Sequence, residues 1–351
     1  MGHQLRAQFA NAHQDVLLLD AGDRAAIEGY LLARDLVSDG ELPSRVERAG
    51  AGNMNLTLRV SLRSRSLILK QGRPWVEKYD HIAAPWERTV IEGQFYEAVR
   101  SVRAVSGRMP ELLAIDRKNH VLVLEDAGST GDFTSMYEDR RISQPDLAEL
   151  LDWLSALGSV TIPDQWQRRF ANRAMRDLNH EHIFSLPLAA QNGLDLDRIT
   201  EGLACAAAEL KRDRAYCWHV SELGTAYLWD GGALVHGDYF PGSWVRAADG
   251  IRIIDPEFCF LGVREFDYGV MLAHLALARA GVEAARQVLA ASDREHLMDT
   301  MVLGFAGVEI MRRLIGVAQL PLPYGIDTKR HLLDVSRSLV LAPERRLACW
   351  S

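Results

Sequence analysis

The sequence predicts an α+β protein of two lobes, a small β-rich lobe over residues 1–127 and a larger, mostly helical lobe over residues 128–351. Before residue 127, short runs of alternating apolar residues are typical of strands, whereas long segments with helical apolar spacing dominate afterwards. A chain of 351 residues is long enough for about two domains. Hydrophobic residues make up 48% and charged residues 25%, which excludes a disordered or fibrous protein.

In the first lobe, a leading helix is predicted around residues 25–32. Leu56, Leu58 and Val60 alternate with polar residues and predict a half-buried strand. Apolar runs at 67–69 and 121–124 predict two further strands, with a helix at 88–102 between them. A strand, strand, helix, strand order predicts a small sheet with a helix packed on it.

In the second lobe, helical periodicity covers residues 145–160, 168–185, 196–212 and 266–319. One segment, residues 233–260, interrupts this pattern. Within it, Asp249-Gly250 lies between two short apolar runs and predicts a β-hairpin. Because hairpin strands are antiparallel, Ser243 and Asp255 should lie side by side at the open end. Asp238, on a loop rich in Gly and Pro, can enter the same space.

Asp238, Ser243, Asp255 and Glu257 would then gather four oxygen donors in one volume. Clustered carboxylates repel one another unless a cation is present. Oxygen ligands without a suitable Cys or His favour Mg²⁺, which also binds substrate phosphates. The alternative is that Asp238 and Asp255 merely cap the ends of a surface hairpin.

Charge and cysteine content restrict the partners and the compartment. The net charge is −7, whereas a nucleic-acid-binding surface normally needs a basic excess, so no nucleic acid is expected. The longest apolar stretch, residues 270–278, is too short for a membrane span, and the first residues resemble no targeting signal. The four cysteines form no C-x-x-C pair, so we expect reduced thiols in a cytoplasmic protein. The oligomeric state stays open, and a homodimer is compatible with the sequence.

Residues 236–243 (HGDYFPGS) and 254–258 (IDPEF) resemble the aminoglycoside phosphotransferase and choline kinase superfamily, which has a protein-kinase-like bilobal fold. Within it, Ser243 and the Asp255-Pro256-Glu257 order are most similar to the 5-methylthioribose kinases. Further similar segments follow in the same order as in that family: residues 50–56, 67–71, 123–126, 265–269 and 311–316.

The resemblance implies a nucleotide site in the first lobe. Gly50, Gly52 and Asn53 would form the phosphate loop, where glycines let backbone N–H groups approach phosphate oxygens. Backbone groups from Glu125 to Ala127 would bind the purine of ATP, although GTP is not excluded.

Lys70 would contact the α- and β-phosphates. Glu92 on the following helix is the expected ion-pair partner of Lys70, with Glu97 as a competitor.

The resemblance also assigns the chemistry. Asp238 would orient the acceptor hydroxyl and take its proton as the catalytic base. Asp255, Glu257 and Ser243 would hold Mg²⁺ across the triphosphate.

Four more residues acquire roles by the same resemblance. His236 would orient the loop by hydrogen bonding, and Asp267 would accept N–H groups of the catalytic loop. Arg312 and Arg313 would reach the acceptor and the transferring phosphoryl group, because the guanidinium fork suits such oxygens. Without the resemblance, this pair would be read as solvated surface charges.

The implied reaction transfers the γ-phosphate of ATP to a sugar hydroxyl, converting 5-methylthioribose to 5-methylthioribose 1-phosphate in methionine salvage. One departure concerns the acceptor: the family loop reads Asp-Leu-His-Thr-Gly-Ser, whereas Tyr239, Phe240 and Pro241 follow the base here. A related sugar or nucleoside-like molecule is therefore an alternative acceptor. An aminoglycoside- or nucleoside-type antibiotic phosphotransferase and a catalytically inactive nucleotide-binding relative are the alternative functions.

Overall fold

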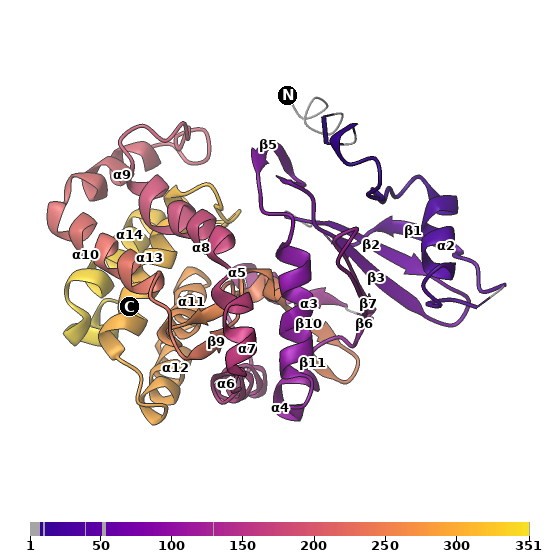
Figure 1. Ribbon diagram of the computed structural model, residues 1–351. Coiled ribbons are helices and arrows are strands. Elements are labelled where there is room, and N and C mark those ends of the chain that lie inside the picture. Colours follow the sequence, from indigo (N-terminus) through magenta and orange to yellow (C-terminus); the bar gives the residue numbers. More distant parts are fainter. Residues whose placement is uncertain (1–7, 10, 39, 51–53, 129, 351) are drawn as a thin grey trace. The chain divides into compact units, whose positions relative to one another are not determined.

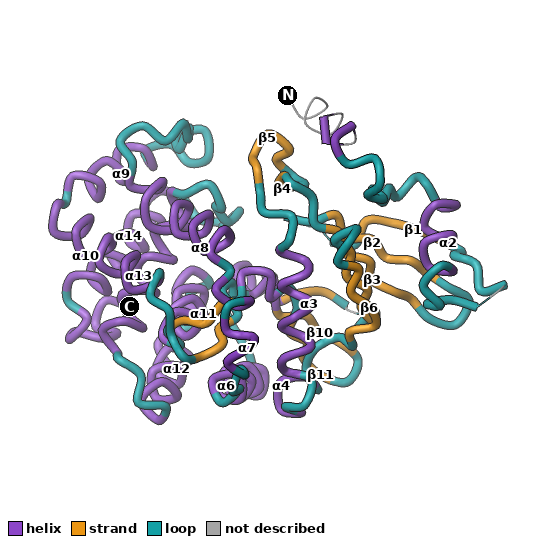
Figure 2. Tube along the Cα trace, in the orientation of Figure 1, coloured by secondary structure: helices purple, strands orange, loops and turns teal. Residues whose placement is uncertain are grey.

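A computed structural model describes residues 8–9, 11–38, 40–50, 54–128 and 130–350. The chain divides into two compact units, Met1–Ser129 and Thr130–Ser351. Figures 1 and 2 show that the first unit is built around a sheet, whereas helices dominate the second. The predicted α+β class, with a small β-rich part followed by a helical part, is confirmed.

The first unit contains a five-stranded antiparallel sheet of order β1-β2-β3-β7-β6. Apolar residues at alternate positions of β2 and β3 point to one face, where helix α2 (Arg24–Leu32) buries Ile27 and Leu31. The strands are β1 (Arg45–Arg48), β2 (Leu56–Ser61), β3 (Ser66–Gln71), β6 (Leu112–Asp116) and β7 (Val121–Glu125).

Helix α3 (Arg88–Val99) packs on the opposite face of this sheet and is continued by a short helix, α4 (Arg103–Ser106). A Cβ atom on Gly93 would lie 2.7 Å from the Ile115 side chain and 2.9 Å from that of Leu122, so helix and sheet are in close contact. Because side chains alternate along a strand, Leu69 faces α2 and Lys70 faces α3. The alternation of side chains along β3 thus points Lys70 toward the helix that carries Glu92.

A second, two-stranded hairpin, β4 (Trp75–Val76) with β5 (Tyr79–Ala83), was not predicted from the sequence. Buried Arg88 ties it to the rest of the unit. Its Nη1 donates to the carbonyls of Arg73 and Pro85, both at 2.7 Å, and its Nη2 donates to those of Met54 (2.6 Å) and Trp75 (3.2 Å). One guanidinium therefore anchors this hairpin to the segment that follows the Gly-rich loop.

The second unit is centred on two helices, α11 (Glu265–Leu277) and α13 (Asp299–Ile315), which are buried on nearly all sides. The helical region predicted over residues 266–319 is three helices, because the chain turns at Gly281 (φ +90°) before α12 (Val282–Arg294) and again at His296 (φ +56°) before α13. The other longer helices are α6 (Gln144–Gly158), α8 (Arg173–His180), α9 (Leu203–Arg212), α10 (Arg214–Tyr227), α12 (Val282–Arg294) and α14 (Ile326–Leu341). No helix in the described ranges is both long and apolar enough to cross a lipid bilayer.

Short strands in the second unit carry the loops of interest. The predicted hairpin is confirmed: β10 (Trp244–Ala247) pairs with β11 (Gly250–Ile253), and β8 (Gly131–Asp132) extends this small sheet. A separate pair joins β9 (Ala233–Val235) to β12 (Phe260–Gly262) in antiparallel register. The loop after β9 and the loop before β12 consequently start and end beside each other.

Candidate active site

The loop after β9 is fixed by a carboxylate at the start of α11. Asp267 accepts hydrogen bonds from the backbone N–H groups of His236 (2.6 Å) and Gly237 (3.0 Å). Burial raises the pKa of Asp267 to about 7, and the two N–H bonds oppose this rise. The predicted role of Asp267 as an acceptor for this loop is confirmed.

His236 is fully buried and uses both ring nitrogens. Nδ1 accepts from the N–H of Asp238 (3.3 Å), so Nε2 carries the proton and donates to the carbonyl of Ile254 (3.0 Å). With neither nitrogen available to a substrate, His236 orients the loop and is not positioned as a base. The prediction for this residue is confirmed.

The two loops touch through Gly237, which has φ +84°. A Cβ atom there would lie 2.3 Å from the carbonyl oxygen of Phe258, so both the conformation and the contact require glycine. The N–H of Ile254 donates to the carbonyl of Ser243 (3.0 Å), which brings Asp255 beside Ser243 in the main chain. Their predicted adjacency at the open end of the hairpin is confirmed.

Asp255 has a left-handed backbone (φ +64°), a conformation that costs energy for any residue with a Cβ atom. The carbonyls of Glu257 and Cys259 accept hydrogen bonds from Nδ2 of buried Asn172, at 3.2 and 2.9 Å. Asn172 thus fixes the segment that carries both proposed metal ligands. Sequence reasoning missed it, because no spacing signal links positions so far apart.

The four predicted oxygen donors do not form one cage. The described part of the chain contains no group of three or more His, Cys, Asp or Glu side chains placed to hold a metal ion. Ser243 Oγ donates to the backbone carbonyl of Asp238 (3.1 Å), while the Asp238 carboxylate bonds to arginine. The expectation that Asp238 shares a metal cage with Asp255 and Glu257 is therefore wrong, because its charge is already paired.

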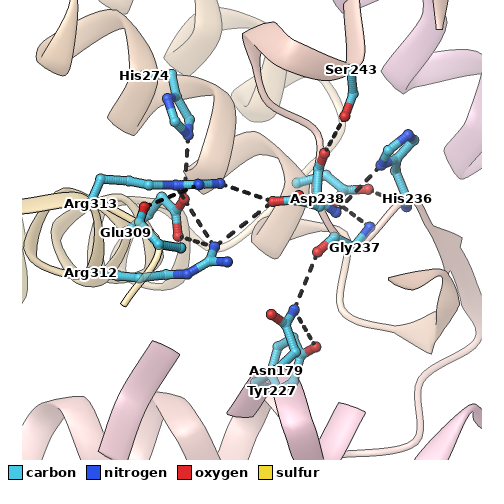
Figure 3. A network of polar contacts seen from close by, with 12 residues as sticks. Asn179, Tyr227, His236, Gly237, Asp238, Ser243, His274, Glu309, Arg312 and Arg313 are labelled. Carbon is cyan, nitrogen blue, oxygen red and sulfur yellow. Dashed lines mark hydrogen bonds and ion pairs between the residues drawn. The ribbon is translucent and has the colours of Figure 1, made fainter. Parts of the chain in front are cut away.

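The Asp238 carboxylate meets the twin arginines of α13 (Figure 3). Arg313 Nη2 donates to Asp238 Oδ1 at 3.1 Å, and Arg312 Nη1 lies 3.8 Å from the same oxygen. Each arginine is only 6% exposed. The reading of this pair as solvated surface charges is wrong, and both guanidinium groups face the predicted base.

Sequence reasoning missed Glu309, which precedes the two arginines by one turn of α13. Its carboxylate accepts from Arg313 Nε (2.5 Å) and from Arg312 Nη1 (3.0 and 3.1 Å). Burial alone would raise the pKa of Glu309, but the two arginines outweigh burial and hold this pKa well below its usual range. Spacings of three and four residues between acid and base on one helix are the signal that would have found it.

Behind Glu309 lies buried His274, whose Nε2 is 3.3 Å from Glu309 Oε1. The Tyr137 hydroxyl is 2.6 Å from His274 Nδ1. Since an ionised carboxylate only accepts, Nε2 donates to Glu309 and Nδ1 accepts from Tyr137. Burial lowers the pKa of His274 to about 4, so the ring is neutral at physiological pH.

Phe240 lies against Arg313, whose guanidinium carbon is 4.7 Å from the centre of the ring. Such a contact stabilises a cation on an aromatic face. Phe240, which stands where the family that the sequence resembles has His, therefore supplies an apolar platform for the arginine beside Asp238. Gly242 allows this packing, since a Cβ atom there would lie 2.5 Å from the Phe240 ring.

In the first unit, Lys70 pairs with Glu92 at 2.7 Å, and both side chains are buried. Glu97 instead lies 3.6 Å from Arg117, near the surface. Of the two predicted partners, Glu92 is therefore the one that pairs with Lys70. A buried cation that emerges from a strand with its own carboxylate partner is held in a fixed place, as phosphate recognition requires.

The structure describes only some of the other residues predicted to bind the nucleotide. Gly50 follows β1 with φ +66°, whereas Gly52 and Asn53 lie outside the described residues. The N–H of Glu125 donates to the Glu111 carbonyl (2.9 Å), so it is not available to a purine. The N–H of Ala127 has no backbone partner among the residues that the structure describes.

No protein-family model matches the chain. It is 26% identical to a methylthioribose kinase of Exiguobacterium sibiricum, covering 88% of this chain and 90% of the relative. A methylthioribose kinase of a Geobacillus species is 24% identical, covering 86% and 87%.

Solved structures support the fold. Spectinomycin phosphotransferase APH(9)-Ia, in complex with ADP and spectinomycin, superposes with a TM-score of 0.53 at 12% identity, over 94% of this chain and all of that one. Choline kinase LicA from Streptococcus pneumoniae gives 0.50 at 14% identity, over 93% and 98%.

A protein-kinase-like fold, a carboxylate on an anchored loop and a buried lysine–glutamate pair define the class of this protein: it is a phosphotransferase of the small-molecule kinase type. The relatives named methylthioribose kinase agree with that class, and the solved structures agree with the fold. Within that class, the chain is similar over most of its length to methylthioribose kinases, and its fold is similar to those of an aminoglycoside phosphotransferase and a choline kinase.

Proposed function

We propose that this protein transfers the γ-phosphate of ATP to the anomeric hydroxyl of 5-methylthioribose, giving 5-methylthioribose 1-phosphate. The observation that carries the proposal is the contact between Asp238 and the buried arginines of α13. A carboxylate is held in place there next to donors that suit oxygen-rich, uncharged sugars. The relatives named methylthioribose kinase support the same acceptor.

Asp238 is the proposed base. Phosphoryl transfer requires little covalent help from the protein and much positioning, so a carboxylate has to orient the acceptor hydroxyl and take its proton. The anchoring of its loop by Asp267 and His236 supplies that positioning. Since Arg313 occupies Oδ1 of Asp238, Oδ2 is the oxygen we assign to the acceptor hydroxyl.

Lys70 is proposed to bind the α- and β-phosphates, with Glu92 holding its ammonium group. Gly50, Gly52 and Asn53 are proposed to approach the phosphates with their N–H groups. For the purine we retain Ala127 as the donor and assign Glu125 at most an acceptor role through its carbonyl.

Asp255 and Glu257 are proposed to hold Mg²⁺, with Ser243 nearby. The donor set fits, because Mg²⁺ is commonly bound through one or two carboxylates together with substrate phosphates and water. When bound, the ion neutralises charge on the phosphate oxygens. Asn172 keeps the segment that supplies both carboxylates in place.

A substrate panel tests the proposal. Purified protein is incubated with MgATP and, in separate reactions, methylthioribose, ribose-containing nucleosides, spectinomycin and aminoglycosides, and phosphorylated products are identified by mass spectrometry. We expect methylthioribose 1-phosphate. Polycationic aminoglycosides should be poor acceptors, because Arg313 already pairs with Asp238, the carboxylate that a polycation would otherwise bind.

Turnover of an antibiotic without turnover of methylthioribose would replace the proposed acceptor and favour a resistance enzyme. Parallel reactions with GTP define the purine preference. Absence of any turnover in the whole panel would favour an inactive nucleotide-binding relative.

A further inference from the structure

The two arginines beside Asp238 differ in how completely they are engaged. All three nitrogens of Arg313 have partners: Nε bonds to Glu309 (2.5 Å), Nη2 to Asp238 (3.1 Å) and Nη1 to the Ala318 carbonyl (3.4 Å). Phe240 closes one face of its guanidinium. Arg313 therefore has little freedom to turn toward a ligand.

Arg312 bonds only through Nη1, which donates to both oxygens of Glu309, among the contacts of the described residues. Its Nε is buried and has no hydrogen-bond partner within the described part of the chain. A buried donor without a partner is costly unless a ligand or water completes it. Figure 3 shows the Arg312 guanidinium turned toward Asp238, where an acceptor oxygen would arrive.

Glu309 produces this difference. Its two oxygens fix one nitrogen of each arginine, and its own position is fixed by the Nε2–H of His274. The Tyr137 hydroxyl holds His274, and the Tyr137 backbone carbonyl accepts from Tyr324 (3.1 Å). The chain of contacts runs from Tyr137 through His274 and Glu309 to the arginines.

Charge gives a reason for the arrangement. Two arginines alone would leave an uncompensated positive charge in a buried place, while Glu309 and Asp238 together balance it. A neutral His274 adds a directed hydrogen bond without adding charge.

We propose that Glu309, supported by His274 and Tyr137, is a positioning residue that gives the two arginines different tasks: Arg313 fixes the carboxylate of Asp238, and Arg312 keeps its donors for an oxygen of the acceptor. The inference rests on the proposed function only in taking Asp238 as the residue that receives the acceptor hydroxyl.

Glu309→Gln tests the positioning role. Glutamine keeps the shape but presents an amide NH₂ to a guanidinium, so at least one arginine loses its anchor. We expect kcat to fall about 100-fold, as for an ångström-scale misplacement of a reacting group, with the KM for ATP unchanged. Tyr137→Phe removes a single hydroxyl at the far end of the chain of contacts and should cause a smaller loss of kcat in the same direction.

Ser336→Ala is the matched control. Ser336 Oγ donates to the Gly307 carbonyl of α13 (2.6 Å) and lies 2.8 Å from the Tyr216 hydroxyl, so it supports the same helix at a buried site outside the network. We expect it to lower Tm with little effect on kcat. If Ser336→Ala lowers kcat as much as Glu309→Gln does, or if Glu309→Gln leaves kcat unchanged, the positioning role is overturned. Should Glu309→Gln not fold, Tyr137→Phe decides, and an unchanged kcat there overturns it.

The division of tasks is tested by Arg313→Lys and Arg312→Lys. Lysine keeps the charge but cannot bridge Glu309 and Asp238 at once. We expect Arg313→Lys to lower kcat and Arg312→Lys to raise the KM for the acceptor. The same pattern of kcat and KM changes in both variants would overturn the division.

The kinetic tests use whichever acceptor the substrate panel identifies. The positioning role of Glu309 can therefore be tested even if that acceptor is not methylthioribose. If no acceptor is turned over, side-chain ¹⁵N NMR of the arginines replaces kinetics. We then expect a slowly exchanging Nε–H signal from Arg313 that is lost in Glu309→Gln and retained in Ser336→Ala. Retention of that signal in Glu309→Gln would overturn the positioning role.

Discussion

Two sets of charged side chains with buried members are compensated within themselves. Lys70 and Glu92 form one pair, and Asp238, Glu309, Arg312 and Arg313 form a balanced group of four. Removing one member of such a set leaves an unpaired buried charge, which commonly costs about 3–5 kcal/mol. The effect of a substitution at these positions on the free energy of unfolding therefore has to be measured separately from its effect on turnover.

Asp238→Asn tests the proposed base while changing the shape of the side chain little. Asparagine keeps the size and can still accept from Arg313, but it cannot take a proton from the acceptor hydroxyl. We expect turnover to be lost while ATP affinity, measured by titration calorimetry, stays nearly unchanged. Near-native activity of the variant would show that another group acts as the base.

His274 makes stability depend on pH. Its pKa lies at about 4 in the folded protein against 6.5 for a free side chain, so between these values the unfolded chain binds the extra proton. The contribution of neutral His274 to the free energy of unfolding is therefore fully present above about pH 6.5. It is lost as the pH decreases toward 4, which lowers the free energy of unfolding by about 3 kcal/mol. Urea unfolding between pH 4 and pH 8 measures this loss. A wild-type slope no steeper than that of His274→Gln would contradict it.

At the scale of elements, the close approach of α11 and α13 brings Asp267 and the twin arginines into one unit of structure. Gly269 permits this approach, because a Cβ atom there would lie 2.6 Å from Phe305 Cβ and 2.8 Å from the carbonyl oxygen of Val302. One of these obstacles is backbone and cannot rotate away. The glycine thus sets the distance between the two helices.

Gly269→Ala is expected to destabilise the protein by about 1–3 kcal/mol, since the helices must separate to admit the methyl group. Gly29→Ala serves as control, because Gly29 lies in α2 and a Cβ atom there would have no neighbouring atom within 4 Å among the described residues. There alanine should stabilise by about 0.5–1 kcal/mol through its higher helix propensity. Equal effects of the two substitutions in thermal unfolding would contradict the packing argument.

At the scale of the whole molecule, each unit has a core of its own and carries a different part of the proposed chemistry. The first holds Lys70 and Glu92 on α3's side of the sheet, and the second holds Asp238 with its arginines. A nucleotide that binds the folded state alone stabilises it by about 2.7 kcal/mol at 100 times its Kd.

We therefore expect saturating MgATP to raise Tm and EDTA to remove most of that gain, because the carboxylates of Asp255 and Glu257 would otherwise face the phosphates without a cation. Differential scanning fluorimetry with ATP alone, MgATP and MgATP plus EDTA measures the effect. A shift that is absent or indifferent to EDTA would argue against the proposed metal pair.

Much of the fold was readable from the sequence because it depends on local periodicity. Alternating Leu56, Leu58 and Val60 predicted β2, and Asp249-Gly250 predicted the hairpin that places Ser243 beside Asp255. The hairpin β4–β5 could not be predicted, since it is held by the long-range bonds of Arg88 to backbone carbonyls. The breaks between α11, α12 and α13 were not predicted either, because apolar residues continue at helical spacing across them.

The sequence by itself determined the two-part α+β architecture and the hairpin that places Ser243 beside Asp255, because both follow from periodicity and turn residues along the chain. The pairing of Lys70 with a glutamate of the next helix was implied by the family resemblance. Only the tertiary structure decided that Glu92 is that glutamate, that Asp238 pairs with arginines and lies outside a metal cage, and that Glu309, His274 and Asn172 belong to the site. Burial and charge compensation between distant segments govern those outcomes, and neither leaves a periodic trace in the sequence.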